Sequence, residues 1–184
     1  MTETTDRLGL PWNLAEWVAK EQLLEWILEA AGTLEWDSPE VVDLLRPHPE
    51  FRPKMLLTLL TYAYATGVFA AADIVKECLV DETCRAITDG EPPTVEEMVT
   101  FRHESRWLVQ WLLFELFQRA ARAEGRLDDC PWPRALKLRL AEAAKLRVEI
   151  AQELDRGPDS SDLLPGSLWP RGFSHGGFFT AQQV

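Results

Sequence analysis

The chain has 184 residues, of which 46% are hydrophobic and 27% are charged, and this composition suits one globular domain or one domain with a tail. The formal net charge is -11, with the largest acidic excess in the first fifty residues. An acidic chain repels a phosphate backbone unless cations gather on one face. The composition therefore disfavours strong nonspecific nucleic-acid binding, but it leaves open a local basic strip in the second half.

The cysteines and the N-terminus predict a cytoplasmic protein. Cys78, Cys84 and Cys130 form no close pair, so we expect reduced, buried thiols rather than a disulfide framework. The first residues are polar and acidic, which is unlike a signal peptide. Residues 55–72 carry no charge, but several threonines, two tyrosines and Gly67 indicate a buried helix followed by a turn rather than a membrane span.

The first predicted helix begins at Asn13, which caps it in a capping-box-like arrangement with Glu16, and ends at Gly32. Apolar residues recur along it at helical spacing. A short helix over residues 40–45 follows the start signal Ser38-Pro39. The prolines of residues 46–49 end it, because each disfavours helix in the residue before it.

The middle of the chain predicts five further helices. Pro53 opens a helix that ends at Gly67, and two shorter helices cover about residues 70–79 and 81–87. Thr94 and Glu97 form a capping box that begins the next helix, and a long apolar helix covers about residues 104–124.

A last helix, about residues 134–155, carries an apolar stripe of Leu138, Ala141, Ala144, Leu146 and Val148. From residue 157 onward, glycine, proline and serine are frequent and no period is visible, so we expect a flexible tail over 157–184. No segment alternates as a strand would. The sequence predicts a compact all-α protein.

Three motifs follow one another in the centre of the chain. The first is the run from Phe51 to Val68, FRPKMLLTLLTYAYATGV, and the second is CRAIT, from Cys84 to Thr88. The third runs from Pro92 to Phe101-Arg102. In their order and spacing over about fifty residues, and more weakly as far as Gly125, these motifs resemble the N-terminal domain of bacterial DDE-type insertion-sequence transposases.

This resemblance divides the chain into four parts. Acidic N-terminal helices, 1–50, would pack on a transposase-like domain, 51–125, with a helix-turn-helix-like centre; a C-terminal helix, 131–156, and the tail, 157–184, follow. The resemblance implies binding to double-stranded transposon-end DNA, and the candidate contacts are the cations in or beside the resembling region, Arg52, Lys54, Arg85, Arg102 and Arg106.

Catalysis is not expected. In the family, an Asp-Gly-Thr strand with the first catalytic aspartate follows this domain, whereas residues 126–131 read RLDDCP and precede a helix. The remaining chain is too short for a nuclease domain. The three histidines are far apart and lack further ligands at metal spacing, so we expect neither a metal site nor a cofactor.

An alternative function stays open, namely a helical protein-interaction or dimerisation module without DNA binding. It is favoured by the acidic first fifty residues and by Ala70–Asp73, where the family often has Ser-Ser-Arg. Trp107 and Trp111 are four residues apart and therefore share one helix face, which is a candidate homodimer seam. The charge around Arg85, Arg102 and Arg106 discriminates the two functions: an open cluster supports DNA, and neutralisation by acids supports a protein partner.

Overall fold

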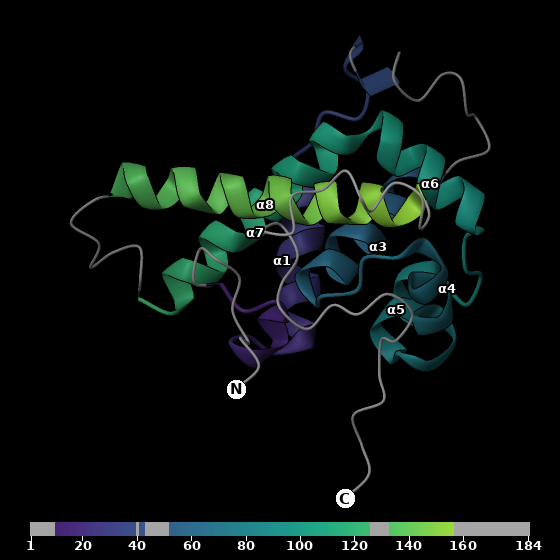
Figure 1. The fold of residues 1–184 in the computed structure, drawn as a ribbon, viewed down its shortest axis with the longest axis horizontal. Helices are drawn as coiled ribbons and strands as arrows, with labels where there is room; N and C mark the ends of the chain where they lie inside the picture. The colour runs from purple at the N-terminus through teal and green to yellow at the C-terminus, as the bar shows by residue number, and fades with distance from the viewer. Residues whose placement is uncertain (1–9, 40, 43–51, 126–132, 157–184) are drawn as a thin grey trace, which may run out of the picture.

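The computed structural model describes residues 10–39, 41–42, 52–125 and 133–156 (Figure 1). Among these residues the regular elements are helices and none is a strand, which confirms the predicted all-α class. The elements are η1 (Leu14–Glu16), α1 (Lys20–Gly32), α3 (Pro53–Ala65), α4 (Ala71–Val80), α5 (Glu82–Thr88), α6 (Val95–Glu104), α7 (Arg106–Ala123) and α8 (Pro133–Asp155). The predicted tail, most of the predicted helix over 40–45, and Cys130 lie outside the described residues.

Helix α3 forms the centre of the core. The residues of α3 from Leu56 to Ala65 carry no charge and are buried without interruption. Helices α1, α5, α6 and α7 pack around them. Pro53 begins the helix, where its missing N–H would have no intrahelical acceptor. The prediction of a buried helix is therefore confirmed. None of the described helices combines the length and the apolar character needed to cross a membrane.

The N-terminal segment differs from the predicted single helix between Asn13 and Gly32. The Asn13 side chain accepts the Ala15 N–H, but it caps only the 3-10 turn η1, and α1 begins later, at Lys20. The turn places Leu14 in the core, fully buried. Gly32 is the last residue of α1, as predicted.

Helices α6 and α7 are separate because the chain bends at Ser105. Thr94 begins α6 with the predicted capping box, in which its hydroxyl accepts the Glu97 N–H and the Glu97 carboxylate accepts the Thr94 N–H. The Ser105 N–H returns to the Phe101 carbonyl at 2.7 Å, and α7 starts at the next residue. The long apolar helix predicted after Phe101 is α7.

Helices α7 and α8 pack against each other in antiparallel directions. Asp155, near the end of α8, pairs with Arg102, just before α7, whereas Arg147 lies over the Phe117 ring further along α7. The end of α7 and the start of α8 therefore lie at the same side of the molecule, on the left in Figure 1.

The predicted apolar stripe of α8 is wrong in part. Leu138 is 63% exposed, whereas Ala144 and Val148 are buried as expected. The buried face follows a different helical row that includes a charged residue. Its members are Leu140, Ala143, Ala144, Arg147, Val148, Ile150 and Ala151.

The C-terminal end of α3 is buried, so its last four carbonyls need partners inside the protein. The Thr66 N–H bonds to the Tyr62 and Ala63 carbonyls, and the Val68 N–H bonds to the Ala63 carbonyl at 2.8 Å. The Val68 bond is the long bond of a Schellman motif, and together with the Thr66 bonds it satisfies the Tyr62 and Ala63 carbonyls, the first two of the four.

Arg147 satisfies the other two. Its Nη1 donates to the Tyr64 carbonyl at 2.7 Å and to the Ala65 carbonyl at 3.3 Å. The same guanidinium donates to the Pro11 carbonyl at 2.6 Å and to the Trp12 carbonyl at 3.1 Å. A cation is also favoured at this end by the helix dipole. One side chain from α8 thus joins the end of α3 to the N-terminal segment.

Gly67 permits this close approach. Its φ of +86° is a left-handed conformation that side chains oppose. A Cβ on Gly67 would lie 3.2 Å from the Trp12 carbonyl oxygen. The glycine is therefore required both by the turn after α3 and by the N-terminal segment that passes over it.

We predict that Arg147→Met lowers the free energy of unfolding by about 3–5 kcal/mol, because each buried carbonyl that loses its donor costs about 1–3 kcal/mol. Urea denaturation followed by circular dichroism measures this change. Lys145→Met on the same helix is the control, since Lys145 is exposed and its replacement should change stability by less than about 0.5 kcal/mol. Equal stability of the two variants would contradict the structural role of Arg147.

We also predict that Gly67→Ala destabilises the protein by about 1–3 kcal/mol, through backbone strain at its positive φ and a tight contact of the new Cβ with the Trp12 carbonyl oxygen. Gly32→Ala is the matched control, because no atom lies within 4 Å of an added Cβ there. That substitution in a helix should be neutral or stabilising by up to about 1 kcal/mol. Thermal unfolding distinguishes the two, and a Gly67→Ala protein as stable as Gly32→Ala would refute the argument.

Candidate functional site

The candidate DNA contacts lie on different elements, and each of the first three has its own intramolecular partner. Arg52, before α3, donates to the Glu91 carbonyl at 2.7 Å and lies 3.7 Å from the Glu91 carboxylate. The Lys54 ammonium lies 5.4 Å from the centre of the Trp36 ring, in a cation–π contact. Arg85, on α5, donates to the Leu79 carbonyl at 2.9 Å.

Arg85 therefore serves the end of α4, where a helix has unsatisfied carbonyls. Arg106 is exposed in the first turn of α7. Because exposed side chains rearrange at little cost, Arg52, Lys54, Arg85 and Arg106 remain available to a ligand. Their role as DNA contacts stays a prediction.

The structure corrects the prediction for Arg102. This side chain is 1% exposed, so it does not reach a phosphate at the protein surface. Its Nη1 donates to the Tyr64 hydroxyl at 2.8 Å and to the Phe69 carbonyl at 2.9 Å, and its Nη2 donates to Asp155 at 2.5 Å. Arg102 instead joins α6 to α3 and α8.

The surroundings of Arg102 have perturbed acid–base properties. Burial raises the pKa of the Tyr64 hydroxyl, and the Arg102 charge opposes this shift. Burial likewise raises the pKa of the Asp155 carboxyl above its ordinary value, again against the effect of Arg102. These shifts arise from the packing of a buried ion pair rather than from an open cleft, so they do not identify a catalytic group.

Cys78 and Cys84 are buried and free, as predicted. A hydrogen bond between the thiols lowers the pKa of Cys78 and raises the pKa of Cys84, and burial also raises the latter. Asp81 caps α5 by accepting the Cys84 N–H at 2.9 Å, and it pairs with Lys20 at 2.6 Å. This cluster joins α1 to the α4–α5 junction.

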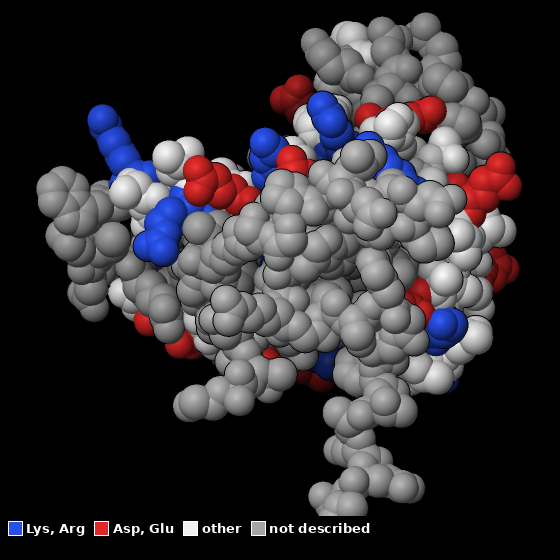
Figure 2. Space-filling view, viewed as in Figure 1, with Lys and Arg blue, Asp and Glu red and all other residues white. Residues whose placement is uncertain are grey.

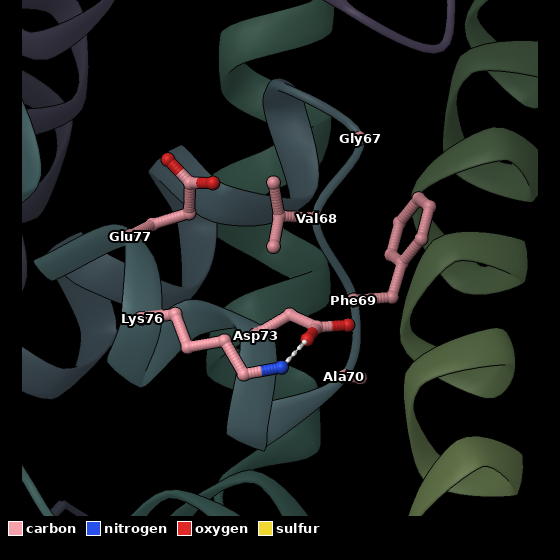
Figure 3. A pocket seen from close by; sticks show the side chains of 7 residues that line it. All are labelled: Gly67, Val68, Phe69, Ala70, Asp73, Lys76 and Glu77. Atoms are coloured by element: carbon pink, nitrogen blue, oxygen red, sulfur yellow. Dashed lines mark hydrogen bonds and ion pairs between the residues drawn. The ribbon is translucent and has the colours of Figure 1, made fainter. Parts of the chain in front are cut away.

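A small pocket lies between the loop after α3 and α4 (Figure 3). Its volume is about 160 Å³, below the roughly 300–1,000 Å³ of ordinary ligand pockets. Val68 points into it, Phe69 points away from α4, and Lys76 pairs with Asp73 at 2.7 Å on the rim. The pocket accommodates a few water molecules rather than a cofactor. Within the described ranges, no group of three or more His, Cys, Asp and Glu side chains is placed to hold a metal ion.

The outward face of α7 carries aromatic side chains. Trp107 and Trp111 lie on one face, as their spacing predicts, and Phe114 continues the row one turn further. Trp107 is 45% exposed, whereas Trp111 and Phe114 are half-buried against the core. We call these three residues the α7 stripe.

A basic surface lies where α8 begins. Arg134, Lys137 and Arg139 are exposed there, and residues 133–141 contain no acid. Blue side chains accordingly mark the left end of the molecule in Figure 2. These cations were not among the residues predicted from the sequence, because they lie outside the resembling region. The sequence feature that predicts this basic surface is the run of cations without acidic residues at the start of the last helix.

No protein-family model, curated protein or solved structure matches this chain. The transposase resemblance therefore rests on the motifs of the sequence.

We predict that Arg102→Met destabilises the protein by about 3–5 kcal/mol, because Asp155 would lose its buried ionic partner. Arg106→Met, four residues further and exposed, should change stability by less than about 0.5 kcal/mol. Chemical denaturation of both variants measures the difference. A stability of Arg102→Met equal to that of the wild type would contradict the structural role of Arg102.

Proposed function

We propose that this chain is a helical protein-interaction module and that the α7 stripe is its contact surface. The observation that carries this proposal is the row of Trp107, Trp111 and Phe114 along one outward helix face, with Trp107 45% exposed. Tryptophan and other aromatic residues are enriched in protein interfaces, where they dominate binding energy. A single exposed apolar side chain is ordinary, but a row of aromatic ones at helical spacing suits a partner.

DNA binding by a transposase-derived domain has less support. Of its five candidate contacts, Arg102 is buried, and only the other four are exposed. The charge pattern that would support DNA, an open cluster of Arg85, Arg102 and Arg106, loses its middle member. The exposed cations at the start of α8 lie outside the region that resembles a transposase domain.

We predict that Trp107→Glu weakens protein binding strongly without unfolding the domain. Tagged wild-type and variant proteins are incubated with a lysate of the source cells, and bound proteins are quantified by mass spectrometry. Proteins that bind through the stripe should decrease at least about tenfold, the effect of losing one central aromatic anchor. Thermal unfolding verifies that the variant is folded.

Leu79→Glu is the matched control, because Leu79 is 62% exposed on α4, away from the stripe. It should leave binding unchanged. A partner set that is the same for both variants and the wild type argues against the α7 stripe. Salt-sensitive binding to duplex DNA that Arg106→Ala weakens and Trp107→Glu does not would instead support the transposase-derived function.

A further inference from the structure

We propose that Cys78 and Cys84 form a reversible redox modification site, at which a peroxide converts the two thiols into an intramolecular disulfide. The proposal is carried by the placement of the two thiols, which are buried and hydrogen-bonded to each other. The site shares no residue with the α7 stripe. It is therefore independent of the proposed function.

The bend between α4 and α5 brings the two thiols together. Cys78 lies in the last turn of α4 and Cys84 in the first turn of α5. In one continuous helix, residues six positions apart would be separated by about 9 Å along the axis, which is too far for a disulfide. Asp81 interrupts the helix with an extended backbone, and its carboxylate caps α5 by accepting the Cys84 N–H at 2.9 Å. Both sulfur atoms therefore lie on the inner side of the same corner.

This pairing separates the two thiols from ordinary buried cysteines. A buried cysteine without such a partner packs as a small apolar group. Here the two sulfur atoms already face each other in a hydrogen bond, so they need only approach further to reach the S–S bond length of about 2.05 Å.

The corner lies at the protein surface, although its thiols face inward. Leu79 and Val80 are 62% and 70% exposed, and Glu82 and Arg85 are also exposed. Helix α5 has seven residues, so it gains little stability from its own hydrogen bonds. Short segments of this kind open locally at a low cost in free energy. A molecule as small as hydrogen peroxide therefore reaches the sulfur atoms.

Cys78 is the attacking thiol. The hydrogen bond from the Cys84 thiol stabilises the Cys78 thiolate and lowers the pKa of Cys78. The thiolate attacks one oxygen of hydrogen peroxide, so an S–O bond forms and the O–O bond breaks. The departing hydroxide takes up the proton that Cys78 had released, which gives water and a sulfenic acid on Cys78.

Cys84 completes the reaction. Its sulfur attacks the sulfenic acid of Cys78, so the S–S bond forms and the S–O bond breaks. The hydroxide that leaves takes the proton of the Cys84 thiol and becomes the second water. In total, the two thiols lose two electrons and two protons, and one hydrogen peroxide becomes two water molecules.

Mass spectrometry tests the site directly. The background variant is Cys130→Ser, in which Cys78 and Cys84 are the remaining thiols. The folded protein is treated with hydrogen peroxide, quenched with acid, alkylated in denaturant and cleaved with trypsin. Cleavage after Lys76 and Arg85 releases both cysteines in one peptide. We expect this peptide to be two hydrogen atoms lighter and unalkylated, and to regain both thiols after treatment with dithiothreitol.

Two further substitutions test the separate steps. Cys84→Ala leaves the sulfenic acid of Cys78 without a second thiol, so the expected product is the sulfinic acid of Cys78. Cys78→Ala removes the attacking thiolate, and Cys84 should then react with peroxide at least about tenfold more slowly. Circular dichroism verifies that both variants are folded. Trp107→Glu should be oxidised at the wild-type rate, which separates this site from the proposed function.

The disulfide should also stabilise the folded protein. It closes a loop of seven residues, 78–84, and so restricts the unfolded chain. A loop of this length should raise the melting temperature by roughly 5–10 °C. Thermal unfolding of the oxidised and reduced Cys130→Ser protein measures this shift. Cys84→Ala treated in the same way is the control and should show no rise.

Four results would overturn the proposal. These are thiols that peroxide leaves unreacted in the folded protein, a sulfinic acid on Cys78 although Cys84 is present, a disulfide that links two chains, and a disulfide that lowers the melting temperature. Oxidation of Cys78→Ala at the wild-type rate would contradict the role of Cys78 as the attacking thiol.

Discussion

The buried carbonyl end of α3 is the constraint on which the rest of the described fold depends. A helix in the middle of a core ends among apolar side chains, where unpaired carbonyls are costly. The N–H groups of Thr66 and Val68, on either side of Gly67, satisfy two of them, and Arg147 satisfies the other two. Because Arg147 also binds the carbonyls of Pro11 and Trp12, the same requirement positions the N-terminal segment and α8.

A second arginine supplements this arrangement and limits the functions open to the surface. Arg102 joins α6, α3 and the end of α8 through Tyr64, Phe69 and Asp155. A buried guanidinium offers several donors in fixed directions, which suits the joining of three elements. Arg102, a cation inside the resembling region, therefore lies in the protein interior. A surface role for this region therefore depends on fewer charges than its sequence suggests.

With α3 enclosed, α7 packs between α1 and α8 and keeps one face directed away from the core. The aromatic side chains on that face, Trp107 and Trp111 among them, supply the contact area of the proposed interaction surface. The proposed interaction surface is thus a consequence of how the helices pack.

Local signals in the sequence determined the all-α class and most helix ends, because Pro53, Gly67 and the pair Thr94 and Glu97 act through hydrogen bonds only a few residues long. The shared face of Trp107 and Trp111 was likewise evident from helical geometry. Only the tertiary structure decided which row of α8 is buried and where its arginine lies. A charged side chain in a helical pattern predicts a position exposed to solvent, unless buried acceptors for its hydrogen bonds are known. The carbonyl acceptors of Arg147 belong to residues more than eighty positions away in the sequence.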